Sequence, residues 1–312
     1  MPSSSNLFDW QVPLSYNRVM SGSAPGYRNM DRFFIQLKAG ESLALSAALQ
    51  RHLRVTPEEA ERLLRQGSVW DHGRQERLRD GNALLHDRLL RVDRPKFVIR
   101  EYVLDPADVK HEDEHLLVVF KRGGVPTQPT PYSDVSDLLH GVQGYLASRG
   151  VAYRPTPVNR LDLPAQGLVL FAKSKRCETA LHRLFDGRHV RKRYLAATAP
   201  FAGAPASCVI RSRLEWQGKE KEALTYVRFC REHGGRFFFL ALPQSGRTHQ
   251  IRRHFRERLA PLLGDVRYGG AAPGGDLWLL CFQYAFPHPF SRERFSVRYV
   301  PPAWQEAMGL EK

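Results

Sequence analysis

The sequence predicts a protein of mixed helices and strands, divided into a small N-terminal domain and a large C-terminal one. Its 312 residues suffice for one domain of about 200 to 250 residues and a small second domain. Between residues 40 and 67, apolar residues recur at the spacing of two short helices. Beyond residue 112, short apolar runs bounded by glycine and polar residues are typical of buried strands. We therefore expect an irregular arm over residues 1–36, a small domain over 37–100 and a large domain over 101–312.

The second helix of the small domain carries clear local signals. Thr56 is an N-cap residue, a proline follows at the first helical position, and Glu59 stands at the capping-box position. Gly67 is expected to end this helix. Short strands are expected to follow at residues 68–71 and 89–92.

The order of these elements resembles a known domain. Two small helices, a glycine stop and a V-x-x-x-G turn ending at Gly73 are similar to the small αL RNA-binding domain of a small-subunit ribosomal protein and of tyrosyl-tRNA synthetase. The similarity covers about residues 40 to 92, with Trp70-Asp71-His72-Gly73 in place of the usual V-N-G. It implies that the small domain contacts RNA, and an ordinary helical hairpin is the alternative.

In the large domain, the stretch from Val158 to Ser174 reads as a loop that leads into a strand. The apolar run from Leu168 to Ala172 is short and follows a glycine, which suits a buried strand better than a helix. Asp162 therefore lies in irregular backbone just before a rigid element, where catalytic groups concentrate. On local grounds alone, an aspartate before Pro164 is more often a turn residue that bonds its own backbone.

The same stretch closely resembles the motif of the RluA-type pseudouridine synthases, H-R-L-D-x-x-[TA]-S-G-L followed by an apolar strand and A-K-S. The Arg, Leu, Asp, Gly and strand positions match, while Asn159 replaces the usual His and Gln166 the usual Ser. The resemblance implies that Asp162 is the catalytic nucleophile.

Further stretches resemble motifs of this family. They are E-D-x-x-L-L-V-V-x-K at 112–121 with Arg122 where Pro is usual, K-x-Y-x-A at 192–196, K-x-A-x-T at 221–225, T-G-R-x-H-Q-I-R-x-H at 245–254 with Ser245 for Thr, G-D-x-x-Y-G at 264–269, and the closing region at 280–289. Together they cover roughly residues 108 to 300. They imply an α+β catalytic domain with a mainly antiparallel mixed sheet and a central cleft.

The resemblance also assigns roles within that cleft. It implies that Arg247 pairs with Asp162, which would favour the charged carboxylate and fix its orientation. It implies that Tyr194 stacks on the uracil, although a tyrosine at the start of a strand is more often an anchored core residue. Arg160 would occupy the space left when the target uridine flips out of its stack.

The charge of the chain predicts a polyanionic partner. Its net charge is +15, and nucleic acid is the leading candidate, with a merely basic protein as the alternative. Two basic stretches, 183–193 and 252–256, are expected to bind the RNA backbone. The residues expected to contact RNA are Arg160, Asn159, Lys192, Arg191, Arg193, His249, Gln250, Arg252 and Arg253.

Other classes of function find little support. The cysteines form no C-x-x-C pair and no cofactor motif appears, so we expect neither a metal nor a cofactor. No stretch has the length of a membrane span or the form of a secretory signal, which leads us to expect a cytoplasmic monomer. An enzyme that hydrolyses or transfers nucleotide phosphates would need a Gly-rich loop followed by Lys and then Ser or Thr. Gly123-Gly124 has no such continuation.

We therefore predict an enzyme that isomerises specific uridines to pseudouridine in ribosomal or transfer RNA. The rival hypothesis is a catalytically silent RNA-binding relative, because Asn159, Gln166 and Arg122 all depart from the family pattern near the cleft. The presence of the catalytic aspartate, tyrosine and arginine argues against that rival.

Overall fold

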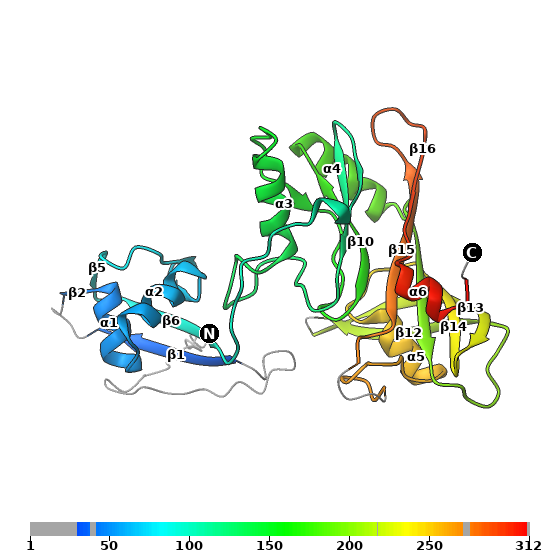
Figure 1. Ribbon diagram of the computed structural model, residues 1–312, viewed down its shortest axis with the longest axis horizontal. Helices are drawn as coiled ribbons and strands as arrows, with labels where there is room; N and C mark the ends of the chain where they lie inside the picture. Colours follow the sequence, from blue (N-terminus) through cyan, green and yellow to red (C-terminus); the bar gives the residue numbers. More distant parts are fainter. Residues whose placement is uncertain (1–29, 38–41, 217, 271–274, 311–312) are drawn as a thin grey trace, which may run out of the picture. The chain divides into compact units, whose positions relative to one another are not determined.

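The computed structural model describes residues 30–37, 42–216, 218–270 and 275–310 of the chain (Figure 1). These residues divide into two compact units. The small unit comprises the chain up to Glu101 together with residues 129–136. The large unit comprises residues 102–128 and the chain from Asp137 onward.

The small unit is built on an antiparallel sheet of four strands in the order β1-β6-β3-β4, with a second pair, β2-β5. Its two helices pack their apolar faces on this framework, with Leu49 and Leu63 in one core with Val92. The elements are β1 Met30–Gln36, β2 Ser42–Ala44, α1 Leu45–Leu53, α2 Pro57–Arg65, β3 Val69–Asp71, β4 Glu76–Arg77, β5 Leu84–His86 and β6 Leu89–Pro95.

Residues 30–36 differ from the sequence prediction, which included them in an irregular arm. They form β1, paired along its whole length with β6. Ile35 is buried and Phe33 packs beside it, while Phe34 meets the ring of His72. Successive side chains of a strand point to opposite sides, and here both sides meet apolar or aromatic neighbours. The alternation is therefore hard to recognise in the sequence. The rest of the predicted arm, residues 1–29, lies outside the described residues.

The predicted start and end of the second helix are both confirmed. The Thr56 hydroxyl accepts a hydrogen bond from the Glu59 amide at 3.2 Å. Gly67 follows the helix with φ +82°, and a Cβ at this position would lie 2.5 Å from a carboxylate oxygen of Asp134. Only glycine suits both requirements.

The segment 129–136 belongs to the small unit although both of its neighbours along the chain belong to the large one. The Trp70 indole donates to the Pro131 carbonyl at 2.8 Å, and the Ser68 hydroxyl donates to the Tyr132 carbonyl at 2.7 Å. Asp134 forms an ion pair with Arg79 at 2.5 Å. Residues 130–133 form a tight turn closed by backbone hydrogen bonds between Thr130 and Ser133, and helix α3 begins only at residue 138.

The large unit contains a mixed sheet with the strand order β12-β13-β14-β11-β15-β10-β8-β7, with β16 beside β15 and β9 beside β10 (Figure 1). Among the described strand pairs, only β10 and β15 run parallel. The elements are η1 Pro106–Asp108, β7 Val109–Glu112, β8 Leu116–Lys121, α3 Leu138–Ala147, β9 Thr156–Pro157, β10 Gln166–Ala172, α4 Lys175–Asp186, β11 Arg191–Thr198, β12 Ser207–Trp216, β13 Lys219–His233, β14 Arg236–Pro243, α5 Gln250–Arg258, β15 Leu279–Pro287, β16 Arg294–Arg298 and α6 Pro302–Ala307.

The parallel pair meets at Gly167, the glycine of the N-R-L-D stretch. Gly167 lies opposite Cys281 with φ +133°, and a Cβ there would lie 2.3 Å from the Cys281 carbonyl oxygen. A side chain at this position would force the two central strands apart. The glycine therefore allows β10 to begin directly beside β15, just after the loop that carries Asp162.

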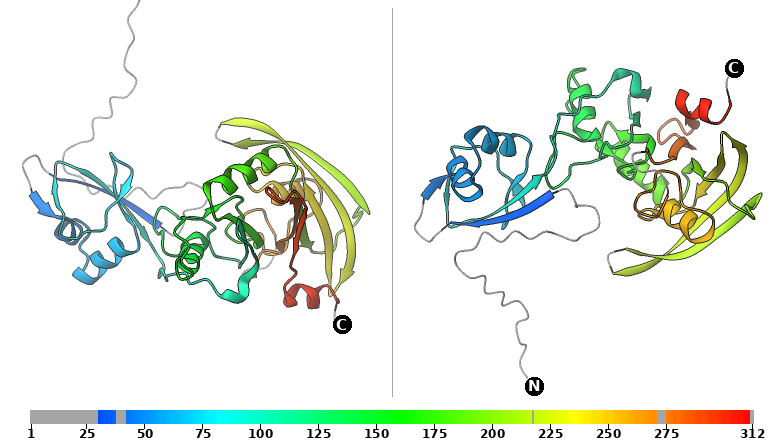
Figure 2. Two further views of the ribbon diagram at one scale, coloured as in Figure 1. Left: turned by 90° about the horizontal axis from the view of Figure 1, so that it is seen from above. Right: turned by 60° about the horizontal axis from the view of Figure 1, so that its bottom comes forward.

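Helix α5 lies against one face of strands β12, β13 and β14 (Figure 2). Ile251 and Phe255 bury their side chains there. The ring of His254 is also buried, with one nitrogen 2.9 Å from the Ser212 hydroxyl and the other 2.9 Å from the Thr225 hydroxyl. Burial, with a smaller effect from the neighbouring arginine side chain, lowers the pKa of His254 to about 4.

This depressed pKa predicts a loss of stability in acid. In the unfolded chain the histidine binds a proton near pH ~6.5, whereas in the folded protein it binds one only at about pH 4. The free energy of unfolding should therefore fall as the pH decreases through this window, and His254→Gln should lack that component. Chemical denaturation of both proteins across the window measures the difference. His182→Gln, on the exposed side of α4, is the control, and a wild-type slope in His254→Gln would contradict the prediction.

Candidate active site

Asp162 lies in the loop between β9 and β10, and this loop is held by groups from a second chain segment. The Thr127 hydroxyl accepts from the Leu161 amide at 3.3 Å and donates to the Leu161 carbonyl at 3.2 Å. The Gly124 amide donates to the Leu163 carbonyl at 2.9 Å. The backbone on both sides of Asp162 is thus fixed. Its side chain is 23% exposed and faces a pocket.

The carboxylate of Asp162 is held by Arg252. The Arg252 Nη1 donates to Asp162 Oδ2 at 3.2 Å, while Nε and Nη2 donate to the two oxygens of Asp265 at 2.8 and 2.7 Å. The side chain of Arg252 is 4% exposed and that of Asp265 is fully buried. One guanidinium therefore binds two carboxylates, that of the buried Asp265 and that of the partly exposed Asp162. Its burial does not fit the prediction that Arg252 binds the RNA backbone.

The predicted ion pair between Arg247 and Asp162 is wrong. The Arg247 amide donates to the Gln250 side chain at 3.1 Å, and its Nε lies 3.4 Å from the Glu222 carbonyl oxygen. Arg247 lies in the turn before α5, whereas Arg252 lies inside the helix on its buried side. The guanidinium of Arg247 still lines the pocket, where a substrate can reach it.

Gln250 was predicted to contact RNA, but its amide group is used within the protein. Its oxygen accepts from the Ser245 hydroxyl at 2.7 Å as well as from the Arg247 amide. Its nitrogen donates to the Leu224 carbonyl and the Thr225 hydroxyl, both at 2.9 Å. Gln250 therefore shapes the turn at the pocket entrance.

Tyr194 lines the pocket from β11, and its hydroxyl is directed into the protein. The hydroxyl is buried close to the Cys281 thiol and the Tyr284 hydroxyl. Asn159 extends this group, since its amide nitrogen donates to the Tyr284 hydroxyl at 2.9 Å. Burial, followed by the effect of the Cys281 thiol, raises the pKa of Tyr194 well above its usual value. The phenol stays protonated at neutral pH, so the ring face is what the pocket offers to a ligand.

Asn159 was predicted to contact RNA, yet it acts beneath the pocket. Its oxygen accepts from the Leu170 amide at 2.8 Å, which ties the loop to β10. Arg160, the next residue, is exposed and lines the pocket, as its predicted role requires.

Burial lowers the pKa of two further pocket residues. Burial lowers the pKa of His249, against the opposing effect of Asp162, whose oxygen lies 3.8 Å from its Nε2. The other ring nitrogen of His249 lies 2.9 Å from the Tyr268 hydroxyl. Burial also lowers the pKa of Lys192, which donates to the Ser245 carbonyl at 3.1 Å.

The predicted basic stripe around residue 192 is divided by the strand. Lys192 and Tyr194 line the pocket, so Arg191 and Arg193 point to the opposite side of the sheet. Arg193 donates to the Gln283 side chain there at 3.3 Å. Arg253 also stays outside the pocket, 3.9 Å from Glu257 on α5.

Sequence analysis missed the contribution of Lys121. This residue is fully buried at the end of β8, and its Nζ donates to the carbonyls of Arg122, Val125 and Leu163 at 3.1, 2.8 and 3.1 Å. Burial lowers the pKa of Lys121 to about 7, against the opposing effect of Asp162. The lysine therefore stabilises the backbone of the Asp162 loop. A lysine that directly follows an unbroken apolar strand was the available signal.

Asp265 and Tyr268, both in the G-D-x-x-Y-G stretch, received no individual role in the sequence analysis. They bind Arg252 and His249 respectively, two basic groups within 4 Å of the Asp162 carboxylate.

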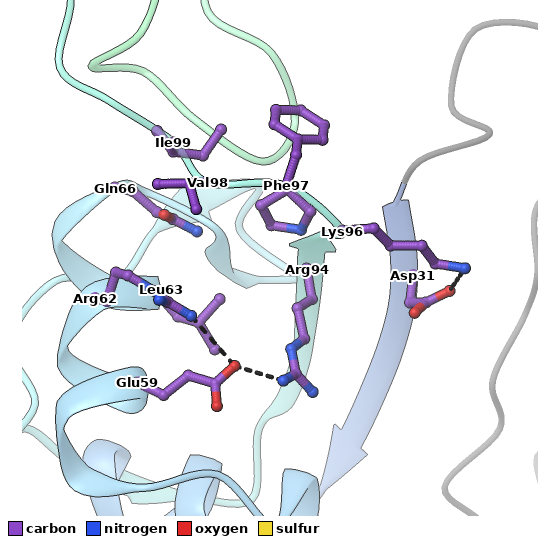
Figure 3. A pocket seen from close by; sticks show the side chains of 11 residues that line it. Asp31, Glu59, Arg62, Leu63, Gln66, Arg94, Lys96, Phe97, Val98 and Ile99 are labelled. Carbon is purple, nitrogen blue, oxygen red and sulfur yellow. Dashed lines mark hydrogen bonds and ion pairs between the residues drawn. The ribbon is translucent and has the colours of Figure 1, made fainter.

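The pocket around Asp162 has a volume of about 90 Å³, and a cavity of about 510 Å³ lies in the small unit. Figure 3 shows that the charged groups of the larger cavity pair with one another. Arg94 and Arg62 lie 2.5 and 3.4 Å from the same Glu59 oxygen, and Lys96 lies 3.0 Å from Asp31. Each of its three cations thus pairs with one of its two carboxylates, and we assign the chemistry to the smaller pocket.

Among the residues that the structure describes, no group of three or more His, Cys, Asp or Glu side chains could hold a metal ion. No described helix is long and apolar enough to cross a membrane.

The chain is similar to known proteins over most of its large unit. The family model described as RNA pseudouridylate synthase matches residues 115–257. An uncharacterized RNA pseudouridine synthase of Aquifex aeolicus is 33% identical over 232 residues, covering 67% of this chain and 71% of that protein. Ribosomal large subunit pseudouridine synthase D of Xylella fastidiosa is 29% identical over 174 residues, covering 53% of each. The chain thus spans about half the length of the first curated relatives it matches.

Solved structures show the same fold. Human RNA pseudouridylate synthase domain containing 4 has a TM-score of 0.53 at 20% identity, covering 65% of this chain and 92% of that one. Human RNA pseudouridylate synthase domain containing 1 has a TM-score of 0.51 at 22% identity, covering 64% and 85%. The predicted α+β class with a mainly antiparallel mixed sheet is confirmed.

The two ion pairs of Arg252 predict a joint loss of stability and activity. Arg252→Met leaves the buried Asp265 carboxylate unpaired, which should cost about 3 kcal/mol or more of unfolding free energy, and it releases Asp162. Arg252→Lys keeps the charge but loses the planar fork, so it should fall between wild type and Met. Arg247→Met is the matched control and should unfold like wild type. Denaturation curves that show the reverse order for the two arginines would refute this assignment.

Proposed function

The chain belongs to the RNA pseudouridylate synthase family, and from this we propose that it converts uridine into pseudouridine within RNA. The observation that carries the proposal is the Asp162 carboxylate, fixed by a buried guanidinium at 3.2 Å and facing a pocket that a tyrosine ring also lines. Such a carboxylate is oriented before the substrate arrives, as catalysis requires.

The reaction is an isomerisation that needs these groups and no net oxidation. The bond from ribose C1′ to uracil N1 breaks, the base turns in place, and C1′ joins uracil C5. The proton on C5 is lost and N1 gains one, so atoms and electrons balance. We propose that Asp162 acts as the nucleophile or base beside the ribose, because it is the carboxylate exposed to the pocket.

Tyr194 and Arg160 supply the remaining parts of the proposal. The Tyr194 ring stacks on the freed uracil and limits its movement while it turns, in keeping with a hydroxyl that is committed to the protein interior. Arg160 is exposed at the pocket and enters the space that the flipped uridine leaves, since flipping costs a few kcal/mol that such an interaction offsets. Arg247, Lys192 and His249 line the same pocket, where they bind the extruded nucleotide.

The charge distribution supports RNA as the partner of the large unit. The large unit, residues 102–128 and 137–312, contains 31 Lys and Arg against 19 Asp and Glu, and thus holds +12 of the net +15. Relatives are named for action on large-subunit ribosomal RNA, and one is named a dual-specificity RNA pseudouridine synthase. We propose ribosomal or transfer RNA as the substrate.

The structure gives no support to the hypothesis of a catalytically silent relative. Asn159 contacts Tyr284 and β10, and Arg122 pairs with Asp108 at 2.9 Å and Asp105 at 3.2 Å. Neither lines the Asp162 pocket, nor does Gln166. The departures from the family pattern therefore leave the groups of the pocket in place.

Asp162→Asn tests the catalytic assignment. The amide is nearly isosteric and should leave folding and RNA affinity unchanged, but it cannot act as nucleophile or base, so turnover should fall by orders of magnitude. Single-turnover release of tritium from uracil C5 measures the rate on a ribosomal RNA transcript. Asp186→Asn, at the end of α4, is the control. A wild-type rate in Asp162→Asn would sink the assignment.

We also propose that the small unit contributes RNA affinity rather than chemistry. Its residues 30–101 contain 14 Lys and Arg against 11 Asp and Glu, so its share of the electrostatic attraction is modest. Arg54 and Arg65 are exposed at the ends of its two helices.

The double variant Arg54→Gln/Arg65→Gln tests this share. It should weaken RNA binding and reduce the slope of log affinity against log salt by roughly 0.7 to 0.9 for each RNA phosphate that the variant fails to neutralise. The single-turnover rate at saturating enzyme should not change. Unaltered affinity at every salt concentration would show that these helices do not bind RNA.

A further inference from the structure

The large sheet has a second face that takes no part in the Asp162 pocket. On β12 and β13, Ile210 and Val227 point inward and pack with α5. Side chains alternate along a strand, so Val209, Tyr226 and their same-face neighbours point the other way. We call this side the outer face, and Figure 2 shows it turned away from α5. Helix α6 covers part of it, because Leu195 and Phe238 on the same side are buried with Trp304. The uncovered part carries the exposed side chains described next.

The outer face carries an unusual set of charges. Six of its exposed arginines face uncharged residues across the strands, two from β11, two from the part of β12 and β13 away from their turn and two from β16: Arg191, Arg193, Arg211, Arg228, Arg294 and Arg298. A seventh, Arg213, lies nearer the turn, opposite Glu222 and 3.8 Å from Glu220. The partners of the six in register on neighbouring strands include Ser207, Leu224, Ala285 and Pro287. These six arginines therefore have no opposite charge directly across the strands.

Part of this surface is already ordered. Arg193 and Arg298 both lie in register with Gln283, which accepts from Arg193 at 3.3 Å and donates to the Ser296 hydroxyl at 3.1 Å. The guanidinium of Arg193 is thus held in position while its remaining donors face solvent.

The same face exposes an aromatic ring on rigid backbone. Tyr226 is 43% exposed and pairs across the strands with Val209, which is 58% exposed, and with Leu242. Arg228 follows two residues along the same strand and Arg211 two residues beyond Val209. A tyrosine flanked by arginines on a sheet is the combination that single-stranded RNA binders use, with bases on the ring and phosphates on the cations.

We propose that the outer face binds an unpaired stretch of the substrate RNA, with its phosphates on the six arginines and a base stacked on Tyr226. The six strands from β12 to β16 span about 24 Å, at roughly 4.8 Å per strand, which is long enough for several nucleotides. The inference rests on the proposed function, since it takes RNA as the substrate. It explains why Arg191 and Arg193 lie in a basic stretch yet face away from Asp162.

Two variants test base stacking and phosphate binding separately. Arg211→Gln/Arg228→Gln should reduce the slope of log affinity against log salt by about 1.4, at roughly 0.7 for each single-strand phosphate. Tyr226→Ala should weaken binding at least about fivefold, and Tyr226→Phe should restore it because the ring remains. Fluorescence anisotropy with a labelled oligouridylate, and with an RNA duplex of equal length, measures the affinities. Arg149→Gln/Arg154→Gln, two exposed arginines elsewhere in the large unit, is the matched control.

The outcomes separate this inference from the proposed function. Selective loss of oligouridylate binding, with single-turnover tritium release at saturating enzyme unchanged, supports the outer face. An unchanged salt slope overturns it. The inference is also overturned if Arg211→Gln/Arg228→Gln weakens the binding of duplex and oligouridylate equally and Tyr226→Ala changes neither affinity. The outer face would then bind duplex RNA. Absence of tritium release from the wild-type enzyme would instead refute the proposed function, whatever the affinities show.

Discussion

The buried ion pair between Arg252 and Asp265 is the interaction on which the active site depends. Burying a guanidinium costs free energy unless a carboxylate accepts two parallel hydrogen bonds from it. Asp265 accepts two from Arg252, at 2.8 and 2.7 Å. The third donor group of Arg252 is then directed at Asp162. The Asp162 carboxylate is thus placed by a pair that is itself fixed in the interior.

That pair requires α5 to be seated with little freedom, and polar side chains achieve this. His254 lies between two hydroxyls, and Gln250 satisfies four groups of the surrounding backbone and side chains. On the opposite side of the pocket, Thr127 and Lys121 hold the backbone of the Asp162 loop. Hydrogen bonds from several separate chain segments therefore define one carboxylate position, which is the preorganisation that catalysis by a small pocket needs.

Strand alternation has a second consequence for function. The run Arg191-Lys192-Arg193-Tyr194 reads as one basic stripe, yet the pleat sends its members to two sides of the sheet. One side lines the Asp162 pocket. The other side carries these arginines together with others from β12, β13 and β16. Under the proposals made above, one face of the sheet acts on a single nucleotide while the other holds a further stretch of the same RNA.

Features that depend on neighbours along the chain can be predicted from the sequence alone. These include the cap at Thr56 and the loop that carries Asp162, since both follow from the local backbone and side-chain chemistry. The reason for glycine at 167 is a contact with Cys281, 114 residues away, and only the tertiary structure shows it. Only the tertiary structure shows which arginine holds Asp162. Arg247 and Arg252 are close to each other in the sequence, and the packing of α5 turns Arg252, not Arg247, towards Asp162. The tertiary structure also decided the partner of Asn159 and the burial of Lys121. The physical reason is the same in each case: contacts between residues 40 or more positions apart depend on helix rotation and strand register, which local spacing does not specify.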